Sequence, residues 1–97
     1  MESIIKSAEI VVFSSEYCPY CSDAIESLKS AGYERIMKVV EADSNHKSQL
    51  SSITKQRTVP QIFINGTFVG GCNDGPEAWM GIKKLLANGK IKDYLSK

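Results

Sequence analysis

Apolar residues recur at two different spacings along the first half of the chain, and these spacings predict its strands and helices. Residues 9–14 predict a strand whose inner residues, 10–13, are apolar in succession, which is typical of a strand covered on both faces. Between residues 20 and 31 the apolar positions follow a helical spacing, and Gly32 stands where that helix would end. Residues 35–41 predict a second strand, so we expect a parallel strand–helix–strand unit with a right-handed crossover.

The second half of the chain predicts an antiparallel arrangement. Residues 61–64 and 67–69 are separated by Asn65-Gly66, a strong signal for a two-residue hairpin turn. Gly70 and Gly71 should end that hairpin, and Pro76 predicts the start of the next helix, capped by a residue at 73–75.

The remaining expected helices are short. One covers residues 3–8 and presents Ile4 and Ile5 to the core. Another is capped by Ser44-Asn45 and carries Leu50 and Ile53. The helix after Pro76 would end at Gly89 and bury Ala78, Ile82, Leu85 and Leu86, and a last helix would contain Ile91, Tyr94 and Leu95.

These elements indicate an α/β fold in one domain, residues 1–97. A mixed central sheet would combine a parallel βαβ half with an antiparallel ββα half, with helices on its flanks. A chain of 97 residues can bury one core without structural disulfides or metals.

Charge and composition narrow the classes of partner. The net charge is +1 and basic residues form no cluster, so we expect neither nucleic acid nor a membrane surface as a partner. Residues 1–6 lack the apolar core of a secretory signal, and no apolar run reaches transmembrane length. Three cysteines in such a chain favour catalysis or metal binding over structural disulfides. We expect a cytoplasmic monomer.

The stretch Cys18-Pro19-Tyr20-Cys21 carries the predicted chemistry. Cysteines three residues apart on a helix share a face and can close a disulfide across the first turn. Pro19 suits the first helical position, which leaves Cys18 at the helix N-terminus. Free N–H groups and the helix dipole stabilise a thiolate there. We therefore predict a lowered pKa for Cys18 and expect its sulfur to be the one that attacks the substrate disulfide. Cys21 should be less exposed and act as the resolving thiol.

Two other interpretations of this cysteine pair are possible besides the catalytic one. The pair could be half of a zinc site, although only Cys72 and His46 remain as further ligands and neither lies in a second paired motif. The two thiols could also be inert core residues. Cys72 itself is interpreted first as a small buried hydrophobic residue, with a peripheral redox thiol as the alternative.

Two further segments could form a clamp around the sulfurs. Pro60 precedes a predicted strand, where a proline would remove a ladder hydrogen bond. Its presence there has two explanations: a cis Val59–Pro60 bond, or a trans proline that opens an edge strand. A bend would expose the Val59 backbone for pairing with an extended peptide. Residues 70–74 would place backbone N–H groups at a helix start, where a carboxylate can bind, or would form only a turn and cap.

Together these motifs resemble a dithiol glutaredoxin over nearly the whole chain. The residues that carry the resemblance are Phe13-Ser14, Tyr17-Cys18-Pro19-Tyr20-Cys21, the segment from Arg57 to Gly66 with Thr58-Val59-Pro60, and Gly70-Gly71-Cys72-Asn73-Asp74. A thioredoxin would more usually carry Trp before the first cysteine and Gly-Pro between the pair.

The resemblance implies a thioredoxin-like fold and a glutathione-dependent thiol–disulfide oxidoreductase. Its partners would be glutathione as cosubstrate and proteins that are glutathionylated or contain disulfides, and it would need no tightly bound cofactor or metal. It would serve electron transport, deglutathionylation and cell redox homeostasis. The implied glutathione contacts are Tyr20 at the sulfur, Thr58, Val59 and Pro60 at the cysteinyl backbone, Gly71, Asn73 and Asp74 at the γ-glutamyl end, and Lys47 and Arg57 at the glycine carboxylate.

The chain departs from the family pattern at three positions. Ser15 replaces a usual lysine, Lys47 stands where glutamine is common, and Gly75 replaces an apolar residue. A binding module is an alternative function, in which two chains would share an iron–sulfur cluster through Cys18 and two glutathiones. Pro19 argues against it, because family members that hold clusters usually have a smaller or more flexible residue there.

Overall fold

The computed structural model describes residues 1–96 and contains one four-stranded sheet. The strands are β1 (Ile10–Ser14), β2 (Met37–Glu41), β3 (Gln61–Ile64) and β4 (Thr67–Gly70). The helices are α1 (Glu2–Ile5), α2 (Pro19–Ser30), α3 (Ser44–Thr54), α4 (Ile82–Asn88) and α5 (Ile91–Leu95), with a 3-10 turn η1 (Glu34–Ile36) before β2.

The sheet is mixed, as the sequence predicts. Its order is β2-β1-β3-β4. The central strand β1 runs parallel to β2 and antiparallel to β3, and β3 pairs antiparallel with β4. This arrangement confirms the predicted α/β class, with a parallel βαβ half joined to an antiparallel hairpin.

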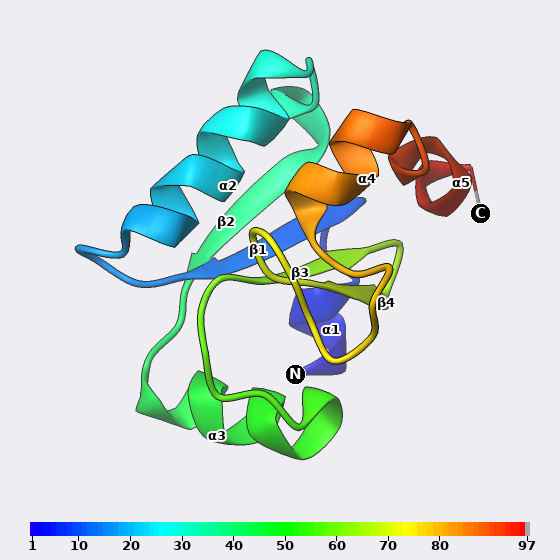
Figure 1. Ribbon diagram of the computed structural model, residues 1–97. Helices are drawn as coiled ribbons and strands as arrows, with labels where there is room; N and C mark the ends of the chain where they lie inside the picture. Colours follow the sequence, from blue (N-terminus) through cyan, green and yellow to red (C-terminus); the bar gives the residue numbers. More distant parts are fainter. Residues whose placement is uncertain (97) are drawn as a thin grey trace.

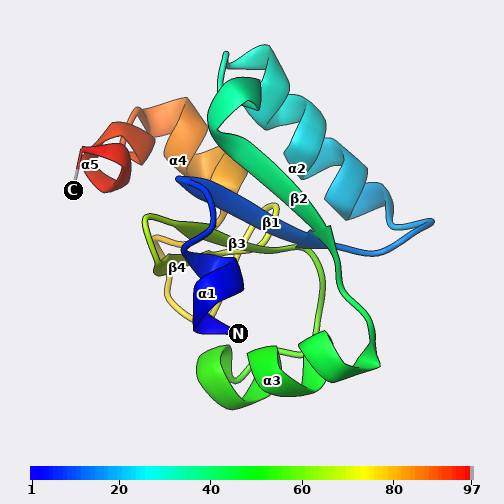
Figure 2. The same cartoon turned by 180° about the vertical axis from the view of Figure 1, so that it is seen from behind.

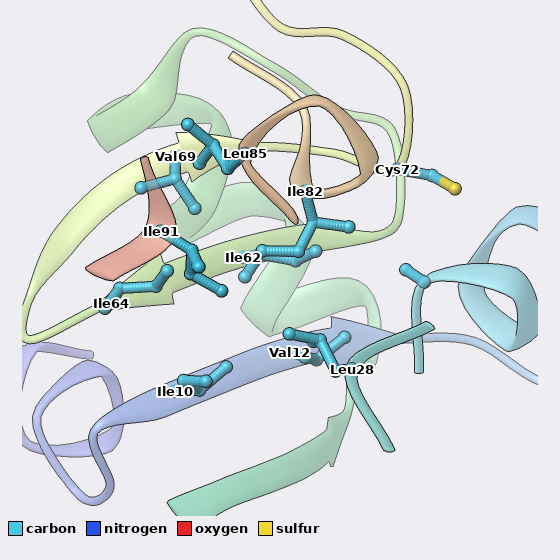
Figure 3. Packing of buried hydrophobic residues seen from close by; sticks show 11 residues of the cluster. Ile10, Val12, Leu28, Ile62, Ile64, Val69, Cys72, Ile82, Leu85 and Ile91 are labelled. Atoms are coloured by element: carbon cyan, nitrogen blue, oxygen red, sulfur yellow. The ribbon is translucent and has the colours of Figure 1, made fainter. Parts of the chain in front are cut away.

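Helices cover both faces of the sheet. Figures 1 and 2 show α2, α4 and α5 on one face and α1 and α3 on the other. Every residue of β1 is buried, and the alternate side chains of its four apolar residues enter two separate clusters. Figure 3 shows the larger cluster, whose buried members are Ile10, Val12, Ala24, Leu28, Ile62, Ile64, Val69, Cys72, Ile82, Leu85 and Ile91. The smaller one, under α1 and α3, comprises Ile5, Val11, Phe13, Ala42, Leu50 and Phe63.

Four predictions of a boundary, a cap or a buried face are wrong in the first half of the chain. Residues 35–36 belong to η1, because the Ile36 N–H bonds back to the Tyr33 carbonyl at 3.2 Å before β2 begins. Helix α3 is capped by Asp43, whose carboxylate accepts the His46 N–H at 2.8 Å. Ile53 is 52% exposed, because α3 turns Leu50 and Thr54 inward and leaves Ile53 at the edge of its buried face. Helix α1 also ends earlier than predicted, at Ile5.

The helix predicted to start at Pro76 begins six residues later, at Ile82. The intervening segment is a loop in which Met80 is buried and Ala78 is exposed. A Cβ on Gly75 would lie 2.7 Å from the Met80 side chain, so this glycine leaves room for Met80. Packing of Met80 into the fold therefore overrides the helix-start signal of the proline.

The C-terminal helix is fixed by the hairpin and by this loop. Asn65 Nδ2 donates to the Tyr94 carbonyl at 2.8 Å and to that of Leu95 at 3.2 Å. The indole ring of Trp79 stacks on Tyr94, with ring centroids 5.4 Å apart and planes inclined by 12°. No helix within residues 1–96 is long and apolar enough to cross a membrane.

Candidate active site

The two cysteines lie at the start of α2, where β1 delivers the chain. Tyr17 takes a left-handed conformation (φ 59°) that turns the backbone, Cys18 is the N-cap, and Pro19 is the first helical residue. The Cys21 N–H donates to Cys18 Sγ at 3.2 Å. The sulfur thus takes the place that a capping oxygen usually occupies, and this N–H favours a negative charge on it. The predicted helix start and the close pairing of the two thiols are confirmed.

The two thiols differ in environment. Cys18 is partly exposed, whereas Cys21 is buried, with 1% of its surface exposed. Burial raises the pKa of Cys21, and a hydrogen bond with Cys18 raises it further, although the Ser15 backbone and the Ser14 side chain act in the opposite direction. Cys21 therefore keeps its proton more firmly than an ordinary cysteine, and its burial agrees with the lower exposure that the sequence predicts.

A hollow of about 350 Å³ opens beside this pair. Cys18 Sγ lies 3.9 Å from the Val59 carbonyl oxygen at its edge. The Val59–Pro60 peptide bond is cis, which decides between the two conformations that the sequence leaves open. The hollow brings together seven of the predicted contact residues and adds Cys72 to them; its lining is Tyr20, Thr58, Val59, Pro60, Gly71, Cys72, Asn73 and Asp74.

Lys47 and Arg57 line a different hollow, of about 440 Å³. Its other lining residues all carry hydroxyl groups and come from one face of α3: Ser44, Ser48, Ser51 and Ser52. Arg57 is followed directly by Thr58 of the first hollow, so the two hollows adjoin at this point of the chain. The hollow beside the cysteines is lined by one carboxylate, Asp74, and the hollow along α3 is lined by two cations. The two hollows therefore carry opposite charges.

Asn73 and Asp74 do not lie at a helix start, contrary to the prediction. They lie in the loop before α4, and the first N–H groups of α4 are already bonded within the protein. Ile82 N–H donates to the Gly71 carbonyl at 2.9 Å, and Lys83 N–H donates to that of Cys72 at 3.0 Å. The helix terminus is therefore occupied by loop carbonyls, and any ligand in the hollow meets the loop itself.

The third thiol belongs to a small polar cluster that the sequence analysis missed. Cys72 is 4% exposed, and its thiol donates to Asp23 Oδ2 at 3.6 Å. Lys83 Nζ donates to the same oxygen at 2.9 Å. Burial, followed by the negative charge of Asp23, raises the pKa of Cys72 to about 11. In Figure 3 its sulfur points towards α2. The first interpretation of Cys72, a buried residue, is confirmed.

A second cluster that the sequence analysis missed fixes the loop carrying Arg57, Thr58 and Val59. Gln61, which is 2% exposed, donates from Nε2 to the Gln56 carbonyl at 2.7 Å and to the Thr58 carbonyl at 3.0 Å. The Thr54 hydroxyl donates to Gln61 Oε1 at 2.8 Å. The signal was present in the sequence, because alternation puts Gln61 on the same buried face as Phe63, and a buried amide requires partners.

Within residues 1–96, no three His, Cys, Asp or Glu side chains gather as metal ligands would.

Comparison with known sequences identifies one family. Residues 10–69 match the Glutaredoxin family. Glutaredoxin-C8 of Oryza sativa is 36% identical over 101 residues, an alignment that covers 98% of this chain and 74% of the relative.

Solved structures agree with this match. Reduced glutaredoxin C1 of Populus tremula x tremuloides has a TM-score of 0.82 and 30% identity, covering 98% of this chain and 78% of that one. A buckwheat glutaredoxin in complex with glutathione has a TM-score of 0.74 and 26% identity, covering 98% of this chain and 83% of that one.

Proposed function

Because the chain belongs to the glutaredoxin family, which makes it a glutathione-dependent thiol–disulfide oxidoreductase, we propose that Cys18 is the attacking thiolate and Cys21 the resolving thiol. The observation that carries this assignment is the hydrogen bond of 3.2 Å from the Cys21 N–H to Cys18 Sγ. It supports negative charge on the partly exposed sulfur, while burial keeps the other sulfur protonated.

On a protein–glutathione mixed disulfide, Cys18 would attack the glutathione sulfur. The bond between glutathione and the protein breaks, the protein leaves as a thiolate that takes a proton from water, and Cys18 is left in a mixed disulfide with glutathione. A second glutathione thiolate then attacks the sulfur of the bound glutathione and releases Cys18, and the product is glutathione disulfide. In sum, the protein–glutathione mixed disulfide and one further glutathione give the protein thiol and one glutathione disulfide.

Disulfides within or between proteins would need both thiols. Cys18 forms a mixed disulfide with one protein sulfur, and the Cys21 thiol, after losing its proton, attacks Cys18 Sγ to release the second protein thiol. The product is the Cys18–Cys21 disulfide, which two glutathione molecules reduce. The raised pKa of Cys21 means that this resolving step speeds up with rising pH, because more of the thiol becomes ionised.

Glutathione would lie across Val59, with its ends in the two hollows. The Thr58 and Val59 backbone would pair with the cysteinyl residue. Its γ-glutamyl amino group would meet Asp74, and its glycine carboxylate would face Arg57, so each charged end faces the opposite charge. A buckwheat glutaredoxin–glutathione complex among the structural neighbours supports glutathione as the ligand. The protein substrates, the monomeric state and the cytoplasmic location stay predictions.

The deciding experiment compares Cys18→Ser with Cys21→Ser in the reduction of a glutathionylated peptide. We expect Cys18→Ser to be inactive and Cys21→Ser to keep much of the activity, because the monothiol route uses only Cys18. Cys72→Ser is measured beside them, because it removes the thiol outside the reactive pair that also lines the hollow and so separates loss of a thiol from loss of the attacking sulfur. An active Cys18→Ser together with an inactive Cys21→Ser would reverse the assignment.

A further inference from the structure

We propose that the hollow along α3, which adjoins the glutathione site, binds acidic residues that follow the reactive cysteine of a protein or peptide substrate. The inference rests on the proposed function, because it extends the path of a substrate across Val59. It predicts that the enzyme prefers disulfide substrates with acidic residues after the reactive cysteine, a preference that binding of glutathione does not by itself imply.

The chemistry of the lining points to carboxylates. The hollow presents the ammonium of Lys47, the guanidinium of Arg57 and four serine hydroxyls, and no acidic side chain lines it. Among residues 1–96, neither cation has a hydrogen bond or ion pair with a carboxylate. Two cations without partners, beside hydroxyl donors, form a surface that attracts anions.

The hollow is larger than the carboxyl terminus of glutathione requires. A carboxylate has three heavy atoms, and at about 30 Å³ for each, the volume of a water molecule, it fills roughly a fifth of the space. The hollow measures about 440 Å³ and follows α3 from Ser44 to Ser52. Further acidic side chains of a longer substrate can therefore enter it.

The direction of the substrate follows from the position of the charges. Arg57 lies two residues before Val59, a distance of about 7 Å in an extended backbone. A peptide that pairs antiparallel with residues 57–59, with its cysteine at Val59, sends its following residues towards Arg57 and then Lys47. Its preceding residues run towards Asp74, where further acidic side chains are repelled.

The test is an equilibrium exchange on Cys21→Ser protein that carries glutathione on Cys18. A peptide thiolate attacks Cys18 Sγ, the bond to glutathione breaks, and glutathione leaves as a thiol. Mass spectrometry then measures the two mixed disulfides. The probes all carry an amidated C-terminus, so that only side-chain carboxylates differ. They are Gly-Cys-Gly-Glu-Glu, its amide analogue Gly-Cys-Gly-Gln-Gln, and the reversed order Glu-Glu-Gly-Cys-Gly. Comparing the peptides within one variant cancels any effect on glutathione itself.

We expect the first peptide to exceed its amide analogue about three- to tenfold at low ionic strength, and this preference to shrink in high salt. The double variant Lys47→Gln/Arg57→Gln should bring the ratio close to one. The matched control is Lys38→Gln/Lys92→Gln, which removes the same charge at two exposed lysines on β2 and α5 and should leave the ratio unchanged.

The outcomes separate the two proposals. Equal exchange of the acidic and amide peptides, or a preference that survives Lys47→Gln/Arg57→Gln, overturns the inference and leaves the proposed function intact. An equal preference for the reversed peptide also overturns it, because the direction would then be wrong. If neither glutathione nor any peptide forms a mixed disulfide with Cys18, the proposed function itself fails.

Discussion

The buried amide of Gln61 is predicted to hold the segment that we propose pairs with glutathione, and Gln61→Met tests this. Methionine has nearly the volume of glutamine but cannot replace its hydrogen bonds. The change removes the two bonds from Nε2 to the Gln56 and Thr58 carbonyls, at 2.7 and 3.0 Å, and the bond from Thr54 at 2.8 Å.

The expected loss of stability follows from these three bonds. A neutral hydrogen bond contributes about 1 kcal/mol net, so their sum is about 3 kcal/mol. Thr58 is exposed, so water can replace the bond to its carbonyl and reduce the loss. We therefore expect the free energy of unfolding to fall by about 2 to 3 kcal/mol. The KM for glutathione should also rise, because Thr58 and Val59 lose the anchor of their loop.

Urea denaturation of the reduced protein measures the first effect, and steady-state kinetics with a glutathionylated peptide measure the second. The matched control is Gln49→Met on α3, whose side chain has no hydrogen bond within residues 1–96 and which should stay within about 0.5 kcal/mol of the parent. If Gln61→Met is as stable as this control and keeps the parent KM, the amide does not fix the loop and the reasoning is refuted.

Three further changes test other parts of the structure. Gly81→Ala should weaken glutathione binding in calorimetry, because at φ 124° its Cβ would lie 2.5 Å from the Asn73 carbonyl; unchanged affinity would show that the loop adapts. A hydrogen bond from Lys83 lowers the pKa of Asp23, so this pair stabilises the fold above about pH 4 and the benefit is lost as pH falls further. Urea midpoints of Asp23→Asn should therefore depend less on pH below 4 than those of the parent. Leu28→Ala, at a fully buried site, should cost about 2 to 5 kcal/mol in urea, and a smaller loss would mean that α2 repacks.

Local signals in the sequence were sufficient for the sheet and the dithiol turn. Hydrophobic spacing located all four strands, Asn65-Gly66 located the hairpin, and Pro19 located the start of α2. Each of these signals depends on neighbouring residues alone. The site at the start of α2 was therefore predictable before its surroundings were known.

Features that depend on distant contacts were not predictable in this way. Pro76 is a valid helix-start signal, yet the burial of Met80 against Gly75 keeps that segment in a loop. Likewise, the resemblance assigns Lys47 and Arg57 to one ligand but not to a hollow of their own, which exists only because α3 lies beside the segment before β3. Their separation from Asp74 is a property of the folded chain.

The stacking of Trp79 on Tyr94 gives the protein an intrinsic fluorescent probe. The chain has one tryptophan, and it lies on the loop between β4 and α4 whose earlier residues, Gly71 to Asp74, line the hollow beside the two reactive cysteines. Its emission therefore reports on a single place, the junction of that loop with the C-terminal helix. Detachment of α5 could be followed optically without attaching a dye and without disturbing either active-site sulfur.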